Sequence, residues 1–190
     1  MITPQQLYLQ SKHKTRVVIY GSQRKLIIAL ILHVLEYHER NVDYLLGTEP
    51  TKYLNNGNEF IVIETAENAH ELKANIALLS SSNTKNNAQV IAFIKSLTNG
   101  GILVYNAEDI SVEQMVKDSS NPIKKYPYHT PEYSIENDIM FLDTREGKLP
   151  LELSGQEDLQ NIAGSKWICQ HMGIDEDDFY EAIGSFSILS

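Results

Sequence analysis

Apolar residues in the first part of the chain fall into short β-branched runs, which alternate with longer segments of helical spacing. A run of four or five aliphatic residues is typical of a strand buried on both faces, whereas apolar residues at every third or fourth position indicate a helix. This alternation predicts an α/β fold, a mostly parallel sheet flanked by helices. The predicted strands are 16–20, 42–46, 60–64, 75–79 and 102–105, and the predicted helices are 25–38 and 87–97.

The pattern changes over residues 123–153, where short stretches alternate between apolar and polar positions. The stretches are IKKYPYH, YSIEN, IMFLD and PLEL, and turn-forming pairs separate them, among them Asn137-Asp138. Residues 123–153 are therefore predicted to form a small antiparallel β-rich subdomain. We expect it to belong to a single domain that spans residues 1–190.

Two further helices are expected near the end of the sequence, over about 157–172 and 175–186. Gly173 suits the C-terminal cap of the first helix, since glycine adopts the left-handed conformation that such caps need. Asp175 precedes the second helix, and its carboxylate is expected to cap it.

Composition and charge narrow the functional classes. The formal net charge is −9 and the pI is about 5.1, which argues against nonspecific binding to nucleic acids or anionic membranes. The N-terminal sequence lacks the apolar core of a signal peptide, and no apolar run is long enough to span a bilayer, so a cytoplasmic location is expected. Cys169 is the single cysteine and the six histidines are scattered, so we expect neither a disulfide nor a metal cluster.

The junction between the first predicted strand and helix reads GSQRKL over residues 21–26. A phosphate-binding loop at such a junction needs glycines for close backbone approach, a lysine for the phosphates and a hydroxyl for Mg²⁺. Gly21 and Lys25 match this pattern, whereas Arg24 stands at the second glycine and Leu26 at the hydroxyl. Taken alone, the stretch is either a degenerate phosphate loop or an ordinary strand-to-helix turn.

The chain resembles the central, ATP-binding domain of the Mur ligases, the ATP-dependent amide-bond-forming enzymes of peptidoglycan synthesis. Their loop reads G-[ST]-x-G-K-[ST], and the similarity continues in order through LILHVLEYHERNVDYLLG, FIVIE, NIALLS, SLTNGGILVYNAED, NPIKKYPYHTPEYSIEN and LQNIAGSKWICQHMGIDEDDFYEAIGSF. It covers about residues 14–186 and is strongest to the branch that joins a tripeptide, or alanine, to UDP-N-acetylmuramate. The resemblance implies ATP and Mg²⁺ as cofactors.

The same comparison implies degenerate sites. Where the family has an acidic E-x-D-E pattern for Mg²⁺ and ATP, this chain keeps Glu64 and Glu67 but has Ala66 in place of the aspartate. A long insertion that follows in the family is shortened here. The family's later Asp-His segment is replaced by SSSNTK over residues 80–85. Glu64 and Glu67 are thus the vestigial metal residues that the resemblance implies.

The nucleotide site is altered in the same way. The family motif G-x-H-N-x-x-N reads GQEDLQN over residues 155–161, so that Asn161 is the matching polar residue. The nucleotide-binding residues that the resemblance implies, all vestigial, are Gly21, Ser22, Gln23, Arg24, Lys25 and Asn161. Lys25 either binds an anion at the helix N-terminus or is a solvated relic, and the Arg24 guanidinium either occupies the phosphate position or clamps an anion.

These features predict a degenerate Mur ligase-like domain that works as a non-catalytic binding or regulatory module. The sequence is expected to lack the N-terminal and C-terminal domains that flank the family's central domain. Two alternatives remain, a weak ATP- or ADP-binding protein and a fragment of an active UDP-N-acetylmuramate peptide ligase. The expected ligand is an anion or a nucleotide, and the expected partner is another protein or a second copy of the chain.

Overall fold

A computed structural model of the chain describes residues 3–47, 57–81, 87–152 and 155–187. Its centre is a sheet of six strands, all parallel, in the order β2-β3-β1-β4-β5-β6. The predicted parallel sheet is confirmed. The strands are β1 (Thr15–Tyr20), β2 (Asp43–Leu45), β3 (Phe60–Glu64), β4 (Ile76–Leu79), β5 (Ile102–Asn106) and β6 (Lys124–Tyr128).

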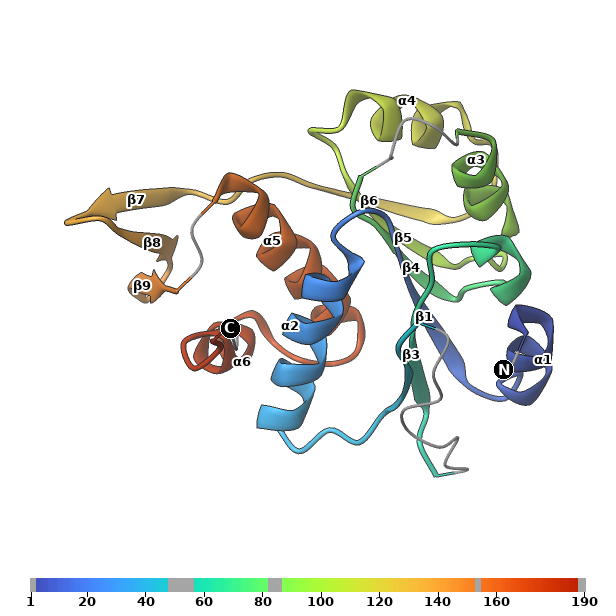
Figure 1. The fold of residues 1–190 in the computed structure, drawn as a ribbon, viewed down its shortest axis with the longest axis horizontal. Helices are drawn as coiled ribbons and strands as arrows, with labels where there is room; N and C mark the ends of the chain where they lie inside the picture. Colours follow the sequence, from blue (N-terminus) through green and yellow to red (C-terminus); the bar gives the residue numbers. More distant parts are fainter. Residues whose placement is uncertain (1–2, 48–56, 82–86, 153–154, 188–190) are drawn as a thin grey trace.

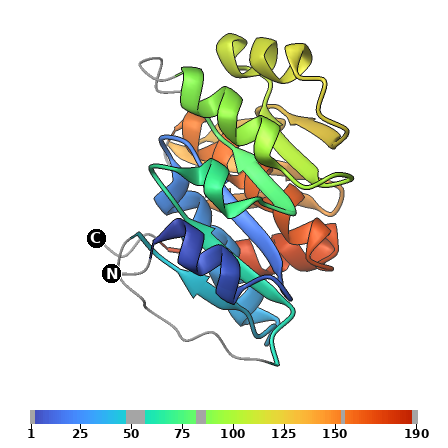
Figure 2. The same ribbon diagram turned by 90° about the vertical axis from the view of Figure 1, so that its right-hand side faces the viewer.

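Helices cover both faces of this sheet (Figures 1 and 2). Because side chains of a strand alternate between faces, Val17 and Ile19 of β1 join one hydrophobic cluster and Val18 and Tyr20 join the other. The first cluster lies under α2 (Arg24–Tyr37), α5 (Gln156–His171) and α6 (Glu176–Ile183), and the second under α1 (Pro4–Gln10), the 3-10 helix η1 (Ala69–Leu72), α3 (Asn87–Ser96) and α4 (Ile110–Asp118).

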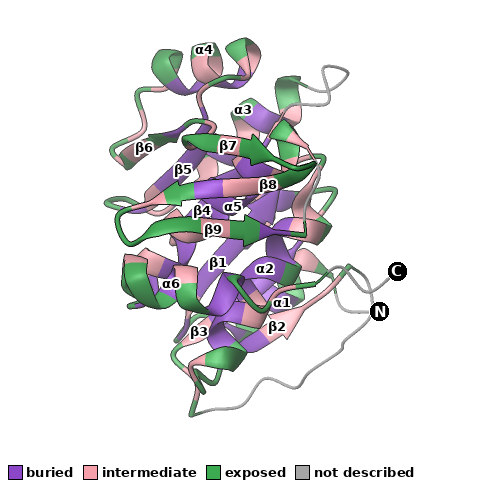
Figure 3. Cartoon of the chain, turned by 90° about the vertical axis from the view of Figure 1, so that its left-hand side faces the viewer, coloured by how far each residue is buried: buried purple, intermediate pink, exposed green. Residues whose placement is uncertain are grey.

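A second, three-stranded antiparallel sheet lies over α5, with α6 beside it (Figure 3). It consists of β7 (Tyr133–Glu136), β8 (Ile139–Thr144) and β9 (Gly147–Leu151). Asn137 and Asp138 both have positive φ, as a two-residue hairpin turn requires, so this predicted turn is confirmed.

The predicted boundary of this subdomain at residue 123 is wrong. Residues 124–128 form β6, which pairs in parallel with β5 at the edge of the main sheet. Tyr128 at the end of β6 is buried in the first hydrophobic cluster. An edge strand with one buried face carries the same alternating pattern as a strand of a small antiparallel sheet, so the pattern did not separate the two. The prediction of one domain over residues 1–190 stays a prediction.

The structure confirms only one of the two helix caps that the sequence predicts near its end. Gly173 has φ +87° directly after α5, as predicted. Asp175 stands at the N-cap of α6, but its carboxylate accepts no capping hydrogen bond from the described residues, so that part of the prediction is wrong. Three acidic residues in the first turn of α6 favour the helix dipole instead.

Two buried basic residues hold the amino-terminal edge of the sheet. Lys14 Nζ lies 3.0 Å from Asp43 Oδ2, and Asn58 donates a hydrogen bond to the other carboxylate oxygen. Arg16 donates to backbone carbonyls of η1 and of the α1–β1 connection, so that its guanidinium joins three elements; the acceptors are Ser11, Lys14, Leu72 and Lys73. Among the described helices, none is long and apolar enough to cross a membrane.

Candidate functional site

The loop after β1 lies where the strand order of the sheet reverses. In the sheet β1 has β3 on one side and β4 on the other, and α2 begins directly after the loop. In open parallel sheets, ligands bind at such a switch point, outside the carboxyl ends of the strands. The position therefore suits a binding site independently of any motif.

Gly21 opens this loop in a conformation that few other residues adopt. Its φ is +132°, and a Cβ atom at this position would lie 2.2 Å from Ser80 Oγ. Ser22 and Ser81 share a hydrogen bond between their hydroxyls. The loop after β1 is thus packed directly against the segment that follows β4. The rest of the predicted Asp-His replacement, residues 82–85, lies outside the described residues.

Arg24, the first residue of α2, turns its guanidinium toward the end of β3. Its Nε lies 3.1 Å from Glu64 Oε1, and its Nη1 donates a hydrogen bond of 3.1 Å to the Gly21 carbonyl. The Glu64 side chain is only 9% exposed, so this ion pair lies at the base of the site. Arg24 thereby supplies the positive charge next to a carboxylate that the resemblance assigns to Mg²⁺ binding.

The two residues after Arg24 point to different surroundings. Lys25 is exposed, and within the described part of the chain no carboxylate forms a salt bridge with it. Both interpretations of Lys25, anion binding and a solvated relic, remain open. Leu26 is half-buried against the hydrophobic cluster under α2, so the position that should offer a hydroxyl to Mg²⁺ packs as an apolar residue.

Glu67 is exposed and lines the same pocket as Arg24 and Glu64. This pocket has a volume of about 520 Å³ and lies between the end of β3 and α1. The structure therefore brings both predicted metal residues to one pocket. Among the described residues, however, no group of three His, Cys, Asp or Glu side chains could hold a metal ion.

Asn161 lies on α5 rather than in the loop, and it is 2% exposed. One turn later the Ser165 hydroxyl lies 2.7 Å from the Asn161 carbonyl and 3.4 Å from the Ile27 carbonyl of α2. Asn161 is thus close to the first turns of α2. Its Nδ2 is buried and has no hydrogen-bond partner among the described residues.

A polar network that the sequence interpretation missed lies at the ends of β5 and β6. Glu108 accepts hydrogen bonds from the Thr130 backbone N–H, the Thr130 hydroxyl and the Gln160 amide. Burial acts to raise the pKa of Glu108, but these hydrogen bonds outweigh it and the pKa falls below its ordinary value. Asn106 donates to Gln160, which completes the network. The polar Asn106-x-Glu108 pattern directly after a strand was the available signal.

Comparisons with known proteins agree with this architecture. No family model matches the sequence, and no curated protein matches it. A UDP-N-acetylmuramate:L-alanyl-gamma-D-glutamyl-meso-diaminopimelate ligase from Neisseria meningitides is similar in structure, with a TM-score of 0.74 at 18% identity, over 98% of this chain and 71% of the ligase. The chain has the fold of the Mur ligases.

Two other ligases of this fold are similar. The murein peptide ligase of Psychrobacter arcticus has a TM-score of 0.75 at 13% identity, over 97% of this chain and 49% of its own. The MurF ligase of Thermotoga maritima, solved in complex with ADP, has a TM-score of 0.73 at 15% identity. The match covers 98% of this chain and 52% of the MurF chain. The chain spans about half the length of these two ligases.

The Mur ligase resemblance implies ATP and Mg²⁺, and the residues present do not fit the Mg²⁺. Mg²⁺ needs oxygen ligands free to coordinate it, and the Glu64 carboxylate is held by Arg24. Leu26 provides no hydroxyl, and Ala66 no carboxylate. The positive charge of Arg24 in the loop is instead paired with a carboxylate of the same chain.

Proposed function

We propose that this Mur ligase-fold chain is a non-catalytic binding or regulatory module. The ion pair between Arg24 and Glu64 carries the proposal. Phosphoryl transfer depends on cations that neutralise the charge of the transferred group. Here the arginine charge at the loop is neutralised by a carboxylate of the chain itself, and it is not available to a phosphate without loss of that pair.

The contact between the two loops supports the same proposal. The loop after β1 is fixed by the packing of Gly21 on Ser80 and by the hydrogen bond between Ser22 and Ser81. A phosphate loop must let several backbone N–H groups surround a phosphate. Arg24 further holds the Gly21 carbonyl, so the loop would have to release these three contacts to wrap a nucleotide.

A second candidate function is weak binding of an anion without ligation. Gln23 is the N-cap residue of α2, but its side chain forms no capping hydrogen bond with a described residue. Lys25 is exposed in the first turn of the helix. A helix N-terminus with free N–H groups attracts anions. We propose that phosphate or sulfate binds near residues 22–25, whereas Mg-ATP binds no tighter than about millimolar, equivalent to roughly 4 kcal/mol.

Calorimetric titration of the full chain with Mg-ATP, ADP and phosphate tests both candidates. We expect no micromolar Mg-ATP binding by the natural sequence. The double variant Arg24→Gly and Leu26→Thr should bind Mg-ATP more tightly, because it frees Glu64 and restores a hydroxyl. Lys117→Gly is the matched control, since it also removes a helical cation that is paired with a carboxylate, and it should leave nucleotide binding unchanged.

Ligation is tested separately with UDP-N-acetylmuramate, amino acids or peptides, and ATP. We expect no ADP release that depends on these substrates. Substrate-dependent ADP release by the pure chain, or micromolar binding of Mg-ATP to the natural sequence, would contradict the proposal. The former result would favour an active ligase fragment.

A further inference from the structure

The pocket of about 520 Å³ beside the loop has apolar walls from three separate elements. Pro4 and Leu7 come from α1, Leu45 from β2 and Leu72 from η1. Leu7 and Leu72 are packed into the second hydrophobic cluster, which fixes these walls in place. Pockets of this size with apolar walls and a few polar groups are the usual form of a small-molecule site.

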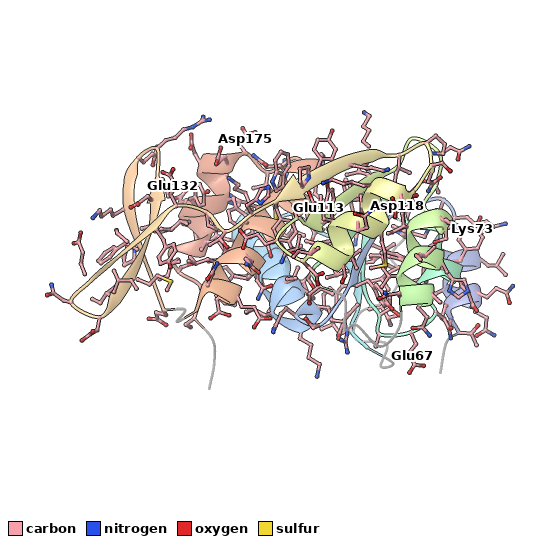
Figure 4. All side chains as sticks on the ribbon, turned by 90° about the horizontal axis from the view of Figure 1, so that it is seen from above. Glu67, Lys73, Glu113, Asp118, Glu132 and Asp175 are labelled. Carbon is pink, nitrogen blue, oxygen red and sulfur yellow. The ribbon has the colours of Figure 1, made fainter. Side chains whose placement is uncertain are left out.

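The polar end of this pocket carries an unbalanced negative charge. Arg24 and Glu64 neutralise each other at 3.1 Å, which leaves Glu67 as the remaining charged residue among the described residues that line the pocket. Glu67 forms no salt bridge with any described cation. Its backbone carbonyl accepts a hydrogen bond from the Thr65 hydroxyl, which fixes the local turn. Figure 4 shows Glu67 at the edge of the molecule, well apart from Glu132, which directly precedes β7.

We infer that this pocket binds a small molecule with an apolar chain and one cationic head group, such as an alkylammonium ion. The apolar chain would contact Leu7, Leu45 and Leu72, and the head group would lie next to the Glu67 carboxylate. The inference rests on the proposed function, because it requires the ion pair of Arg24 with Glu64 to persist.

An anionic occupant is disfavoured by the same charges. The Arg24 guanidinium already contacts one carboxylate and one carbonyl, and Glu67 repels a second negative charge. The pocket thus selects a charge opposite to that of the phosphate expected at residues 22–25. One ligand would lie at the α2 N-terminus, and the other in the pocket toward α1.

The test uses three probes with the same six-carbon chain, hexylammonium, hexan-1-ol and hexanoate. Each is titrated into the full chain at pH 7, with binding followed by NMR shifts of the leucine methyl groups. We expect the shifts to centre on Leu7, Leu45 and Leu72. Hexylammonium should bind more tightly than hexanoate by on the order of fivefold, the scale of one solvent-accessible ion pair.

Glu67→Gln and Leu45→Ser separate the head-group contact from the apolar contact, and Glu132→Gln is the control. Glu67→Gln should abolish the preference for hexylammonium over hexan-1-ol while hexan-1-ol still binds. Glu132→Gln removes an exposed carboxylate elsewhere and should leave the preference intact. Leu45→Ser should weaken all three probes alike.

Hexanoate binding as tight as hexylammonium, leucine shifts outside this pocket, or a preference that survives Glu67→Gln would each overturn the inference. The proposed function fails by a different measurement, namely micromolar Mg-ATP binding or substrate-dependent ADP release. A chain that binds neither ATP nor hexylammonium would therefore overturn the pocket inference alone.

Discussion

At the scale of single residues, Gly21 is fixed by two constraints at once. Its φ of +132° is strained for residues with a Cβ, and the added atom would lie 2.2 Å from Ser80 Oγ. Gly21→Ala should therefore lower the free energy of unfolding by about 2 to 4 kcal/mol, from backbone strain and from overpacking together. Urea denaturation measures this loss.

Gly173→Ala provides the control for the backbone part. Gly173 also has a positive φ, +87°, but a Cβ atom added there would have no heavy atom within 4 Å outside its own chain neighbours. Gly173→Ala should lower the free energy of unfolding only through backbone strain, by about 1 kcal/mol. Equal losses for the two variants would mean that the contact between the loops after β1 and β4 contributes nothing to the requirement for glycine.

The sequence predicts some features of the site but not others. Gly21 and Arg24 follow from a local motif, since a loop of six residues after a strand has recognisable spacing. The partnership of Arg24 with Glu64 could not be predicted, because 40 positions separate them and their contact depends on β3 being next to β1. The network of Glu108, Thr130 and Gln160 was missed for the same reason.

At the scale of elements, the buried ion pair of Lys14 and Asp43 joins the start of β1 to β2. Both side chains are almost fully buried, at 0% and 1% exposure. Asp43→Asn would remove the carboxylate charge that lies 3.0 Å from the buried lysine, which costs about 3 to 5 kcal/mol. Thermal or urea unfolding should show this loss.

The exposed pair of Lys117 and Glu113 on α4 offers the matched comparison. Their atoms are 2.7 Å apart, and the lysine side chain is 61% exposed. Glu113→Gln should cost no more than about 0.5 kcal/mol, because water and salt screen an exposed pair. If the two substitutions had the same effect, burial would not be the source of the Asp43 contribution.

Element prediction succeeded where burial was continuous. The core strands β1, β3, β4 and β5 each contain a run of three or four buried apolar residues, and the sequence showed these runs directly. Helix α4 was missed because only Val112 and Val116 are buried along it, too few to set a helical period. Its start depends on the Asp109 carboxylate, which accepts from two backbone N–H groups.

At the scale of the whole molecule, His171 links stability to pH. Its ring packs on Tyr126 and Trp167, so that α5 joins the sheet edge at β6. Burial lowers the pKa of His171 below its ordinary value of 6.5, and the charge of Lys124 lowers it further. Below pH 6.5 the unfolded chain therefore takes up this proton before the folded chain does.

Stability should then fall as the pH drops below about 6.5, until the folded-state pKa of His171 is reached. Unfolding midpoints in urea between pH 8 and pH 5 measure the slope. His171→Gln should flatten this part of the profile, whereas replacement of the exposed His13 by glutamine should not. An unchanged slope in His171→Gln would assign the dependence to other groups.

The ion pair of Arg24 and Glu64 also constrains how the chain can evolve. Arg24→Gly alone would leave a nearly buried carboxylate without its counter-charge, and loss of Glu64 alone would leave the arginine in the loop. In both single variants Leu26 would still offer no hydroxyl to Mg²⁺. Under the proposed function, regaining nucleotide binding requires Arg24→Gly together with Leu26→Thr, and the first of these removes the counter-charge of Glu64. The ion pair therefore opposes reversion, and descendants of this sequence are expected to keep Arg24 and Glu64 while other positions vary.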